Sequence, residues 1–310
     1  MRKKNINKKT LFHVYFLDWI DMYKRGVVSK YTLQKYIMTH KRLAEIAPDV
    51  TLDDLDRRTY QWIISEYGKT HEKQTVGDFH THLRASIRDA FDEGIIGRDP
   101  SRRVVITGRE PSKKKEKWLS QQELQRLMYS LDLTHGVNQD WIIFLIAKTG
   151  LRYAEALGVT PADFDFEKRK LTINKTWNYK AEEGGFIPTK NASSKRIIEI
   201  DPRTAEAFSR LVIGMEPNEP VLVTGRMFNA TSNDHLKSLC EKVGITVISI
   251  HSLRHTHASL LIFAGVSMLS ISKRLGHSNL TTMLNVYSHI VDEMENRDSD
   301  KAMSYLMAIG

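Results

Sequence analysis

Apolar residues in the first hundred positions recur every three or four places, the spacing that gives an α-helix one apolar face. The first such run contains Phe12, Phe16, Trp19, Ile20 and Tyr23. Similar runs extend over residues 32–46, 53–67 and 75–93, the last followed by Gly94. Because glycine commonly follows the end of a helix, this pattern predicts four helices and therefore a small all-helical bundle.

Helical spacing returns after residue 117. Ser120 and Glu123 have the spacing of a capping box before a new apolar run. Residues 140–149 are strongly apolar and are followed by Gly150, which predicts a further helix. Helical patterns resume at about residue 230. We therefore expect a second domain that is mainly helical.

Between these helical regions the period changes to two. Residues 170–176 and 195–200 alternate and contain β-branched side chains, which is typical of strands. Gly184, Gly185 and Pro188 lie between the two runs and indicate turns. The second domain is thus predicted to be α+β, with a small inserted sheet that is either a hairpin or three strands. The whole fold is expected to be mainly α with a small β-sheet.

A boundary between the domains is indicated at residues 106–117. This segment combines glycine, proline and a run of lysines with few apolar residues, a composition typical of an exposed linker. The expected domains are then residues 1–105 and 118–310. The linker lysines could also lie along the phosphates of a duplex, and they are Lys113, Lys114 and Lys115.

The chain of 310 residues has 46 Lys and Arg against 37 Asp and Glu, a net charge of +9. A basic surface attracts nucleic acid, although a merely basic protein fits the charge equally well. Residues 1–110 contribute +6 of this excess, so both domains could contact DNA. Arg84 and Arg88 are four residues apart in the fourth predicted helix and could form a DNA-binding face or a solvated one.

Cysteine usage and hydropathy indicate in which cellular compartment the protein is expected. Cys240 is the only cysteine, which excludes an internal disulfide and a multi-cysteine zinc site and fits a reducing cytoplasm. The basic N-terminus is followed by no long apolar run, and no stretch approaches the roughly 20 apolar residues that cross a bilayer. We expect a cytoplasmic protein without a membrane partner.

Four short segments contain candidates for chemistry: Thr149–Leu157, His251–Thr256, Leu275–Ser278 and Thr282–Tyr287. Each alone has an ordinary interpretation. Arg152 can pair with Glu155, and Tyr287 can belong to an apolar helical stripe. The histidines at 251 and 255 are spaced like a metal pair, but no third ligand is evident.

Together, and in this order, the segments resemble the catalytic domain of the tyrosine recombinases, which include phage integrases and the integrases of conjugative transposons. The resemblance covers roughly residues 115–295. The family pattern of Arg, hairpin Lys, His-x-x-Arg, Gly-His and Tyr reads here as Arg152, Lys190, His251, Arg254, His277 and Tyr287. Alternatives to Lys190 are Lys175, Lys180 and Lys195. The helical first domain resembles, by pattern alone, the family's core-binding domain, a core-type DNA-binding domain.

Physical chemistry gives these residues compatible roles. Arg152 and Arg254 can hold both non-bridging oxygens of the scissile phosphate, where charge develops in the transition state. Tyr287 would be the nucleophile, and because a tyrosine pKa is ordinarily near 10 it needs a base or a positive field. His251 is the expected base on cleavage and acid on religation.

The remaining groups complete this expectation. Lys190 would protonate the leaving 5′ oxygen, His277 would hydrogen-bond the phosphate, and Glu155 would brace the site. The resemblance implies a 3′-phosphotyrosyl intermediate that keeps the bond energy, so no ATP is needed. Two arginines also leave no obvious need for a metal, and no cofactor is expected.

The resemblance also implies partners. They are double-stranded DNA recombination sites held between the two domains, a homotetramer on DNA, and in some systems an accessory DNA-bending or directionality factor. The tail at residues 294–310 would pack either on a neighbouring protomer or on its own domain. Many integrases carry an additional N-terminal domain for arm-type sites. Here the core-binding pattern begins near residue 10, so the chain is either a short member or a fragment.

Other functions stay open at this point. A type IB topoisomerase shares the chemistry but relaxes supercoils without exchanging strands. A DNA-binding regulator that has lost catalysis would keep the fold, and a metal-dependent nuclease is a more distant alternative. The helical first domain, the tail and the complete residue set favour a site-specific recombinase that integrates or excises a mobile element.

Overall fold

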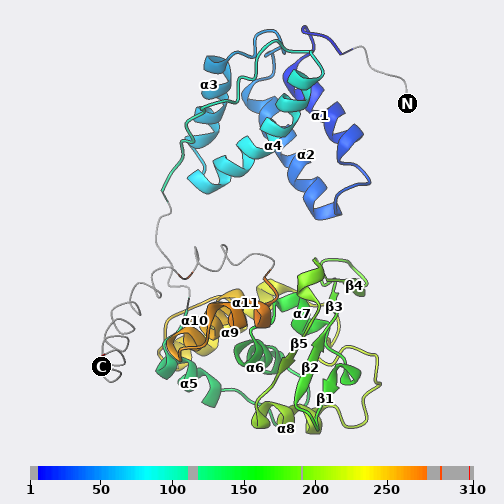
Figure 1. Ribbon diagram of the computed structural model, residues 1–310, viewed down its shortest axis with the longest axis vertical. Coiled ribbons are helices and arrows are strands. Elements are labelled where there is room, and N and C mark those ends of the chain that lie inside the picture. Colours follow the sequence, from blue (N-terminus) through cyan, green and yellow to red (C-terminus); the bar gives the residue numbers. More distant parts are fainter. Residues whose placement is uncertain (1–5, 111–117, 190, 278–286, 288–306, 308–310) are drawn as a thin grey trace. The chain divides into compact units, whose positions relative to one another are not determined.

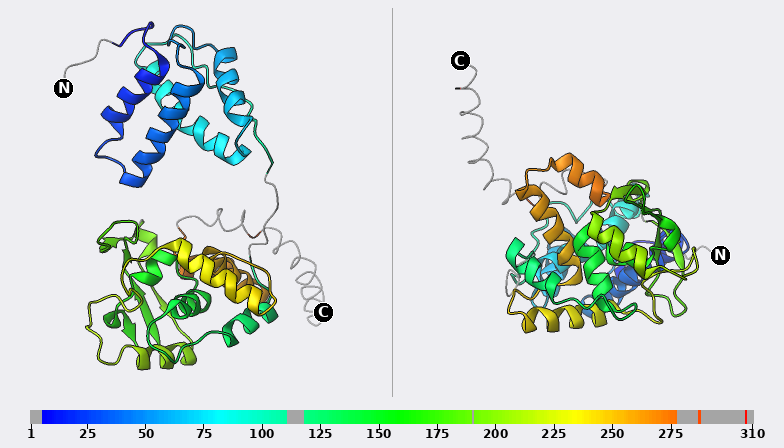
Figure 2. Two further views of the ribbon diagram at one scale, coloured as in Figure 1. Left: turned by 180° about the vertical axis from the view of Figure 1, so that it is seen from behind. Right: turned by 90° about the horizontal axis from the view of Figure 1, so that it is seen from below.

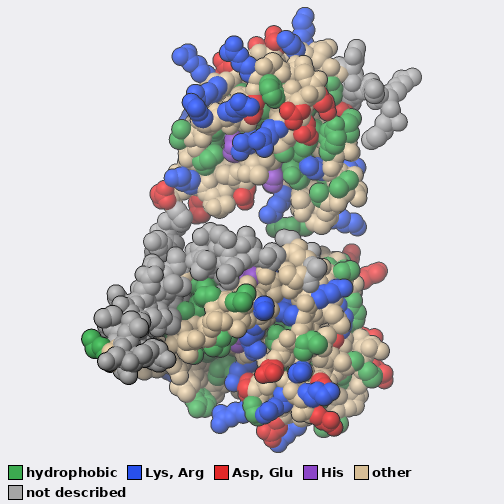
Figure 3. All heavy atoms as spheres, in the orientation of Figure 1, with side chains coloured by type: hydrophobic (Ala, Val, Ile, Leu, Met, Phe, Trp, Pro, Cys, Tyr) green, Lys and Arg blue, Asp and Glu red, His purple; other side chains and the backbone are tan. Residues whose placement is uncertain are grey.

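The computed structural model describes residues 6–110, 118–189 and 191–277 together with Tyr287 and Met307. It divides the chain into two compact units, Met1–Lys114 and Lys115–Gly310 (Figure 1). Lys and Arg side chains are scattered over the face of each unit seen in Figure 3, with Asp and Glu among them. Within the described ranges, no helix is long and apolar enough to cross a membrane.

The first unit is helical, as predicted. Its described helices are α1 (Phe12–Tyr23), α2 (Lys30–Ile46), α3 (Arg57–Gly68) and α4 (Lys73–Asp92). The boundaries differ from the predicted ones because polar caps fix the starts. Ser29 accepts a hydrogen bond from the Thr32 N–H, and Asp56 accepts one from the Thr59 N–H. The predicted apolar face of α1 lies in the core of this unit, except for the half-exposed Tyr23.

Residues 106–110, expected to belong to the linker, pack on the first unit instead. Ile106 contacts its hydrophobic core. The Arg109 N–H donates to the His71 carbonyl at 2.9 Å, and the Lys73 N–H donates to the Arg109 carbonyl at 3.0 Å. A Cβ at Gly108 would lie 2.7 Å from the Lys73 backbone. The predicted linker was wrong here because a glycine in the sequence can indicate either a linker or a close backbone contact, and Gly108 makes the contact.

The second unit combines helices with two small sheets. Its helices are α5 (Gln121–Tyr129), α6 (Gln139–Thr149), α7 (Tyr153–Leu157), α8 (Pro202–Leu211), α9 (Asn229–Lys242), α10 (Ile250–Phe263) and α11 (Met268–Leu275), with short 3₁₀ turns η1 (Pro161–Asp163) and η2 (Ala192–Ser194). Its strands are β1 (Phe164–Asp165), β2 (Lys170–Ile173), β3 (Lys175–Trp177), β4 (Phe186–Pro188) and β5 (Arg196–Glu199). The predicted capping box of Ser120 and Glu123 opens α5.

The strands form two antiparallel sheets. One has the order β1-β2-β5, and β2 pairs with β5 over Lys170↔Glu199 to Ile173↔Arg196. The other is the β3–β4 hairpin, in which Lys175 faces Pro188. The predicted strand 170–176 is therefore divided after Ile173 between the two sheets. Both predicted alternatives, a hairpin and three strands, are present.

Helix α6 lies at the centre of the second unit. Figures 1 and 2 show it between the helices α9 and α10 on one side and the three-stranded sheet on the other. Nearly all of its side chains are buried, which explains its apolar sequence. Asn138 caps its start, and Gly150 ends it in the left-handed region, φ +70°. The chain that leaves this buried helix enters the candidate site directly.

Candidate active site

Arg152 lies at the start of α7, three residues after α6 ends. Its backbone N–H donates to Oε2 of Glu155 at 3.0 Å, and its Nη1 donates to Oε1 at 2.7 Å. Nη2 also contacts the carbonyl of Gly276 at 3.3 Å. The Arg152 side chain keeps 37% of its surface exposed. This guanidinium is thus oriented by the protein but open on one side to a ligand.

Arg254 lies in the first turns of α10, which Ser249 caps. It is only 3% exposed, and its Nη1 and Nη2 donate to the carbonyls of Gly150 and Leu275, both at 2.7 Å. These carbonyls belong to the C-terminal ends of α6 and α11, where a cation is favoured. Burial lowers the pKa of Arg254 to about 9, so the side chain remains charged at neutral pH.

Glu155 is the buried anion of this cluster, with 2% of its surface exposed. It contacts Arg152, lies 2.9 Å from Nη2 of Arg196 and lies 3.9 Å from Nη1 of Arg254. Burial acts to raise the pKa of Glu155, but Arg196 and Arg152 overcome that effect and hold it below its ordinary value. The carboxylate therefore stays ionised and holds the arginines together.

Arg196 was not among the site residues predicted from the sequence. Its side chain is 7% exposed, and besides Glu155 it contacts the carbonyls of Arg274 at 2.6 Å and Ser194 at 2.9 Å. The residue thus connects β5 to α7 and α11. A single arginine next to Lys195 at the start of a strand carries no distinctive pattern, so nothing in the sequence could have singled it out.

Two glycines in the left-handed region allow the segments to meet. A Cβ at Gly150 would lie 2.6 Å from Leu275 and 2.8 Å from His257, while one at Gly276, φ +68°, would lie 2.9 Å from Nη1 of Arg196. Both positions combine a positive φ with a close approach. The Thr-Gly-Leu-Arg and Gly-His segments are therefore constrained by packing as well as by chemistry.

We predict that Gly150→Ala destabilises the second unit by more than the roughly 1–2 kcal/mol cost of a left-handed alanine, because it adds a clash. Gly244→Ala is the matched control, since Gly244 has φ +65° and no atom within 4 Å of an added Cβ. Chemical denaturation measures both variants. If both variants lost the same free energy of unfolding, the side chains around Gly150 would have moved aside for the new Cβ without an energetic cost.

His277 follows Gly276 and closes the site from the end of α11. Burial, with help from Arg254 and Arg152, lowers the pKa of His277 to about 4, so its imidazole is neutral at pH 7. Its Nδ1 is buried and has no hydrogen-bond partner among the described residues. A buried polar atom in this state is costly, and a ligand oxygen is one way to satisfy it.

Tyr287 is 2% exposed and packs on apolar side chains of α10 and α11. Burial raises the pKa of Tyr287 to about 12, and the charge of Arg254 acts in the opposite direction. Its hydroxyl lies 2.9 Å from Nδ1 of His255, within hydrogen-bond distance. The imidazole in contact with the Tyr287 hydroxyl is thus that of His255, while Arg254 acts on Tyr287 through its charge.

His251, the base expected from the sequence, lies one turn before His255 on α10. The two rings meet edge to face, with centroids 5.0 Å apart. Burial lowers the pKa of His251, and the charges of Arg254 and Arg152 act in the same direction. Sequence analysis considered His255 only as half of a metal pair and missed its contact with Tyr287.

Of the predicted catalytic lysine and the predicted DNA-contacting residues, the structure describes only Arg84 and Arg88. Lys190, Lys113, Lys114 and Lys115 lie outside the described residues. Arg88 is exposed on α4 and lines a cleft of about 490 Å³ that also contains Asp89, Asp92 and Asp99. Arg84 is half-buried, and its Nε has no hydrogen-bond partner in the part of the chain that is described. The two arginines therefore differ in exposure, and Arg88 lies among acids.

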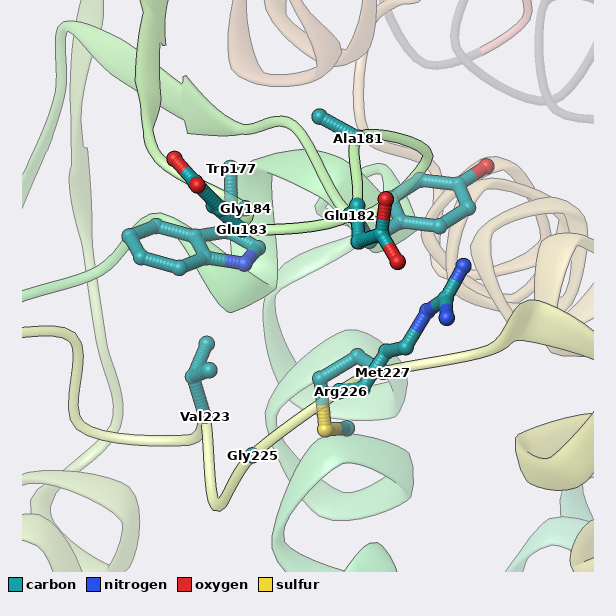
Figure 4. A pocket seen from close by; sticks show the side chains of 10 residues that line it. Trp177, Ala181, Glu182, Glu183, Gly184, Val223, Gly225, Arg226 and Met227 are labelled. Carbon is teal, nitrogen blue, oxygen red and sulfur yellow. The ribbon is translucent and has the colours of Figure 1, made fainter.

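A separate pocket of about 230 Å³ lies beside the turn of the β3–β4 hairpin (Figure 4). Trp177, Glu182 and Gly184 line it from the hairpin, and Arg226 and Met227 line it from the segment before α9. None of the arginines, histidines or tyrosine of the candidate site lines this pocket. We therefore place the active site at the arginine and histidine cluster rather than here.

The fold and this cluster define a DNA strand-transfer enzyme of the tyrosine recombinase class. The model of the phage integrase family matches residues 117–294, and the chain belongs to that family. The chain is 25% identical to the integrase of Staphylococcus phage L54a, over 96% of this chain and 94% of the relative. It is also 25% identical to the ICEBs1 integrase of Bacillus subtilis, over 97% and 83%.

Solved structures share the fold. The Tn1549 transposon integrase in complex with transposon right end DNA has a TM-score of 0.75 at 20% identity, over 93% of this chain and 99% of that one. A lambda integrase dimer bound to a COC′ core site has a TM-score of 0.65 at 17% identity, over 89% and 94%. The chain therefore shares the fold of these integrases, with a helical unit and an α+β unit as predicted from the sequence.

Proposed function

We propose that this tyrosine recombinase cleaves and rejoins DNA at specific sites through the hydroxyl of Tyr287, which forms a 3′-phosphotyrosyl intermediate. The observation that carries the proposal is the position of this hydroxyl. It lies against His255, next to Arg254 along α10, and the charge of Arg254 acts on its pKa. A tyrosine hydroxyl beside a positive group can be activated as a nucleophile.

The two arginines would bind the scissile phosphate. A guanidinium has five N–H donors, so the two carbonyl contacts of Arg254 leave donors for a phosphate oxygen. Arg152 offers its exposed side to the second non-bridging oxygen. Three arginines surround one carboxylate, Glu155, so the cluster has an excess of positive charge that a phosphate would partly neutralise. Donors fixed before the reaction stabilise the transition state without reorganisation.

The remaining roles follow from chemistry and family resemblance. His277 would donate a hydrogen bond to the phosphate, which would also satisfy its buried ring. His251, whose pKa the charges of both arginines help to lower, would contact the same phosphate. Lys190 would protonate the leaving 5′ oxygen. Glu155 and Arg196 would hold the arginines in position without contacting the substrate.

The proposed substrate is double-stranded DNA containing recombination sites of a mobile element. Integrases of a phage and of an integrative element are relatives, and the similar solved structures contain DNA. Net positive charge in both domains supports phosphate contacts. We propose Arg84, Arg88 and the linker lysines among these contacts, a homotetramer during strand exchange, and an accessory bending or directionality factor.

The proposal predicts a covalent protein–DNA complex that forms in EDTA. The protein is incubated with a nicked suicide duplex that carries its recombination site, from which the cleaved strand diffuses away. A denaturing gel should then show a slow band that protease digestion removes, because the intermediate needs neither metal nor ATP. Absence of this band on a duplex that the protein demonstrably binds would overturn the catalytic proposal and favour a binding-only regulator.

A second assay separates recombination from topoisomerase activity. A plasmid with two sites should yield recombinant products, whereas a supercoiled plasmid without a site should be relaxed slowly or not at all. Fast relaxation without recombinant product would instead assign the same covalent chemistry to a type IB topoisomerase.

A further inference from the structure

The hydroxyl of Tyr287 has a hydrogen-bond partner that the expected residue set does not include. Its oxygen lies 2.9 Å from Nδ1 of His255, and the two rings are 5.9 Å apart between centroids. His255 follows Arg254 on α10, so the imidazole that contacts Tyr287 and the guanidinium whose charge acts to lower its pKa belong to the same turn of one helix. The contact is partly buried.

We infer that His255 is a further catalytic residue, the proton acceptor for Tyr287 during strand cleavage. This inference rests on the proposed function of Tyr287 as the nucleophile. A neutral imidazole has one acceptor nitrogen, and Nδ1 of His255 lies where it can accept the tyrosine O–H when the ring proton is on Nε2, the tautomer that this step requires. A general base must lie within hydrogen-bond reach of the proton it removes, and His255 does.

The environment of Tyr287 makes a base necessary. The side chain is buried among apolar groups, and burial raises its pKa to about 12 despite the charge of Arg254. Only a very small fraction of such a tyrosine is ionised at neutral pH. The positive charge of Arg254 alone therefore leaves the hydroxyl protonated. Transfer of its proton to an adjacent imidazole would make the tyrosine oxygen nucleophilic.

His251 is less well placed for this task. In the described part of the site, the hydroxyl of Tyr287 pairs with His255, while His251 packs against the His255 ring in a T-shaped contact from one helical turn away. His251 instead lies three residues before Arg254 on α10, on the same face of the helix, and the charges of Arg254 and Arg152 both act on its pKa. The two histidines thus have different proposed roles. His255 accepts the proton of the nucleophile, and His251 contacts the phosphate.

The Tyr287 oxygen forms a bond to phosphorus as its proton passes to Nδ1 of His255, and the bond from phosphorus to the 5′ oxygen breaks. That oxygen takes a proton from Lys190, the proposed acid. On religation the 5′ hydroxyl returns its proton to Lys190 as it attacks phosphorus. The His255 imidazolium then returns its proton to the departing tyrosine oxygen.

His255→Asn tests the proton transfer while keeping the contact. The carboxamide oxygen of Asn lies as many bonds from the backbone as Nδ1, so it can accept the same hydrogen bond, but it is not basic. We expect normal DNA binding and single-turnover cleavage of the suicide duplex slower by about 100-fold or more. His135→Asn, a substitution of an exposed histidine outside the site, should cleave like the wild-type protein.

Two further measurements separate a base from a structural contact. In His255→Gly, added imidazoles should restore cleavage in proportion to their basicity, which mere filling of space would not produce. A duplex with sulfur in place of the leaving 5′ oxygen needs no acid, so it should restore Lys190→Ala and leave His255→Asn slow.

Cleavage by His255→Asn at the wild-type rate would overturn the inference, as would rescue of His255→Asn by the sulfur leaving group. If added imidazoles restored cleavage by His251→Gly but not by His255→Gly, His251 would be the base instead. Failure of the proposed function is a different result, since the wild-type protein would then form no covalent complex at all.

Discussion

Tyr287→Phe is expected to abolish the covalent protein–DNA complex and strand exchange while leaving DNA binding intact. The substitution removes only the hydroxyl oxygen that would bond to phosphorus, so no partial activity should remain. Arg152, Arg254 and His277 would still bind the phosphate. The suicide duplex and a denaturing gel measure the covalent complex, and fluorescence anisotropy with the same duplex measures binding.

The variant should fold almost normally. The phenyl ring keeps its packing on α10 and α11, and the loss of the hydrogen bond with His255 costs about 1 kcal/mol. Tyr129→Phe is the matched control, because Tyr129 is 81% exposed and lies on α5, outside the site. An undiminished covalent band in Tyr287→Phe would assign the nucleophile to another residue. Tyr129→Phe should keep the covalent band, the DNA binding and the stability of the wild-type protein.

The fold could be predicted from local patterns wherever one face of an element is buried. The apolar stripe of α1 and the continuous apolar run of α6 were sufficient, as were the capping box at Ser120 and the glycine stop at Gly150. The strand at residues 170–176 was less predictable. Its alternation continues past Ile173, but hydrogen bonding to β5 ends there and a second pairing, with β4, begins at Lys175.

The site could be predicted only as far as its motifs are local. Arg152, His251, Arg254 and His277 are recognisable by spacing, and the described structure brings them to the ends of α6, α10 and α11. The contacts of Arg196 and His255 are not local. Arg196 meets Glu155 across 41 positions and His255 meets Tyr287 across 32, so neither pairing leaves a trace in neighbouring sequence.

Glu155 is the residue whose loss should disturb this arrangement most. It is the buried carboxylate that Arg152 and Arg196 both contact, and Arg254 lies 3.9 Å away. Without it, three guanidiniums would face one another in a partly buried space. Removal of one partner from a buried ion pair costs more than the pair contributes, because the remaining charges are left uncompensated.

We therefore predict that Glu155→Gln lowers the free energy of unfolding of the second unit by about 3–5 kcal/mol. Displacement of Arg152 should slow cleavage by about 100-fold, since misplacement of a positioning group by about 1 Å has that effect. Chemical denaturation and single-turnover cleavage measure the two effects. Glu216→Gln, at an exposed position, should change neither.

The pH dependence identifies charge as the cause. The arginines hold the pKa of Glu155 below its ordinary value of 4.5, so its stabilising contribution is complete at neutral pH and is lost as the pH falls through the lowered pKa. The stability difference between the wild-type protein and Glu155→Gln should thus be largest near pH 7 and shrink below about pH 4.5. A difference that stays constant down to acidic pH would mean that Glu155 acts through shape and hydrogen bonding, and that its negative charge does not hold the arginines together.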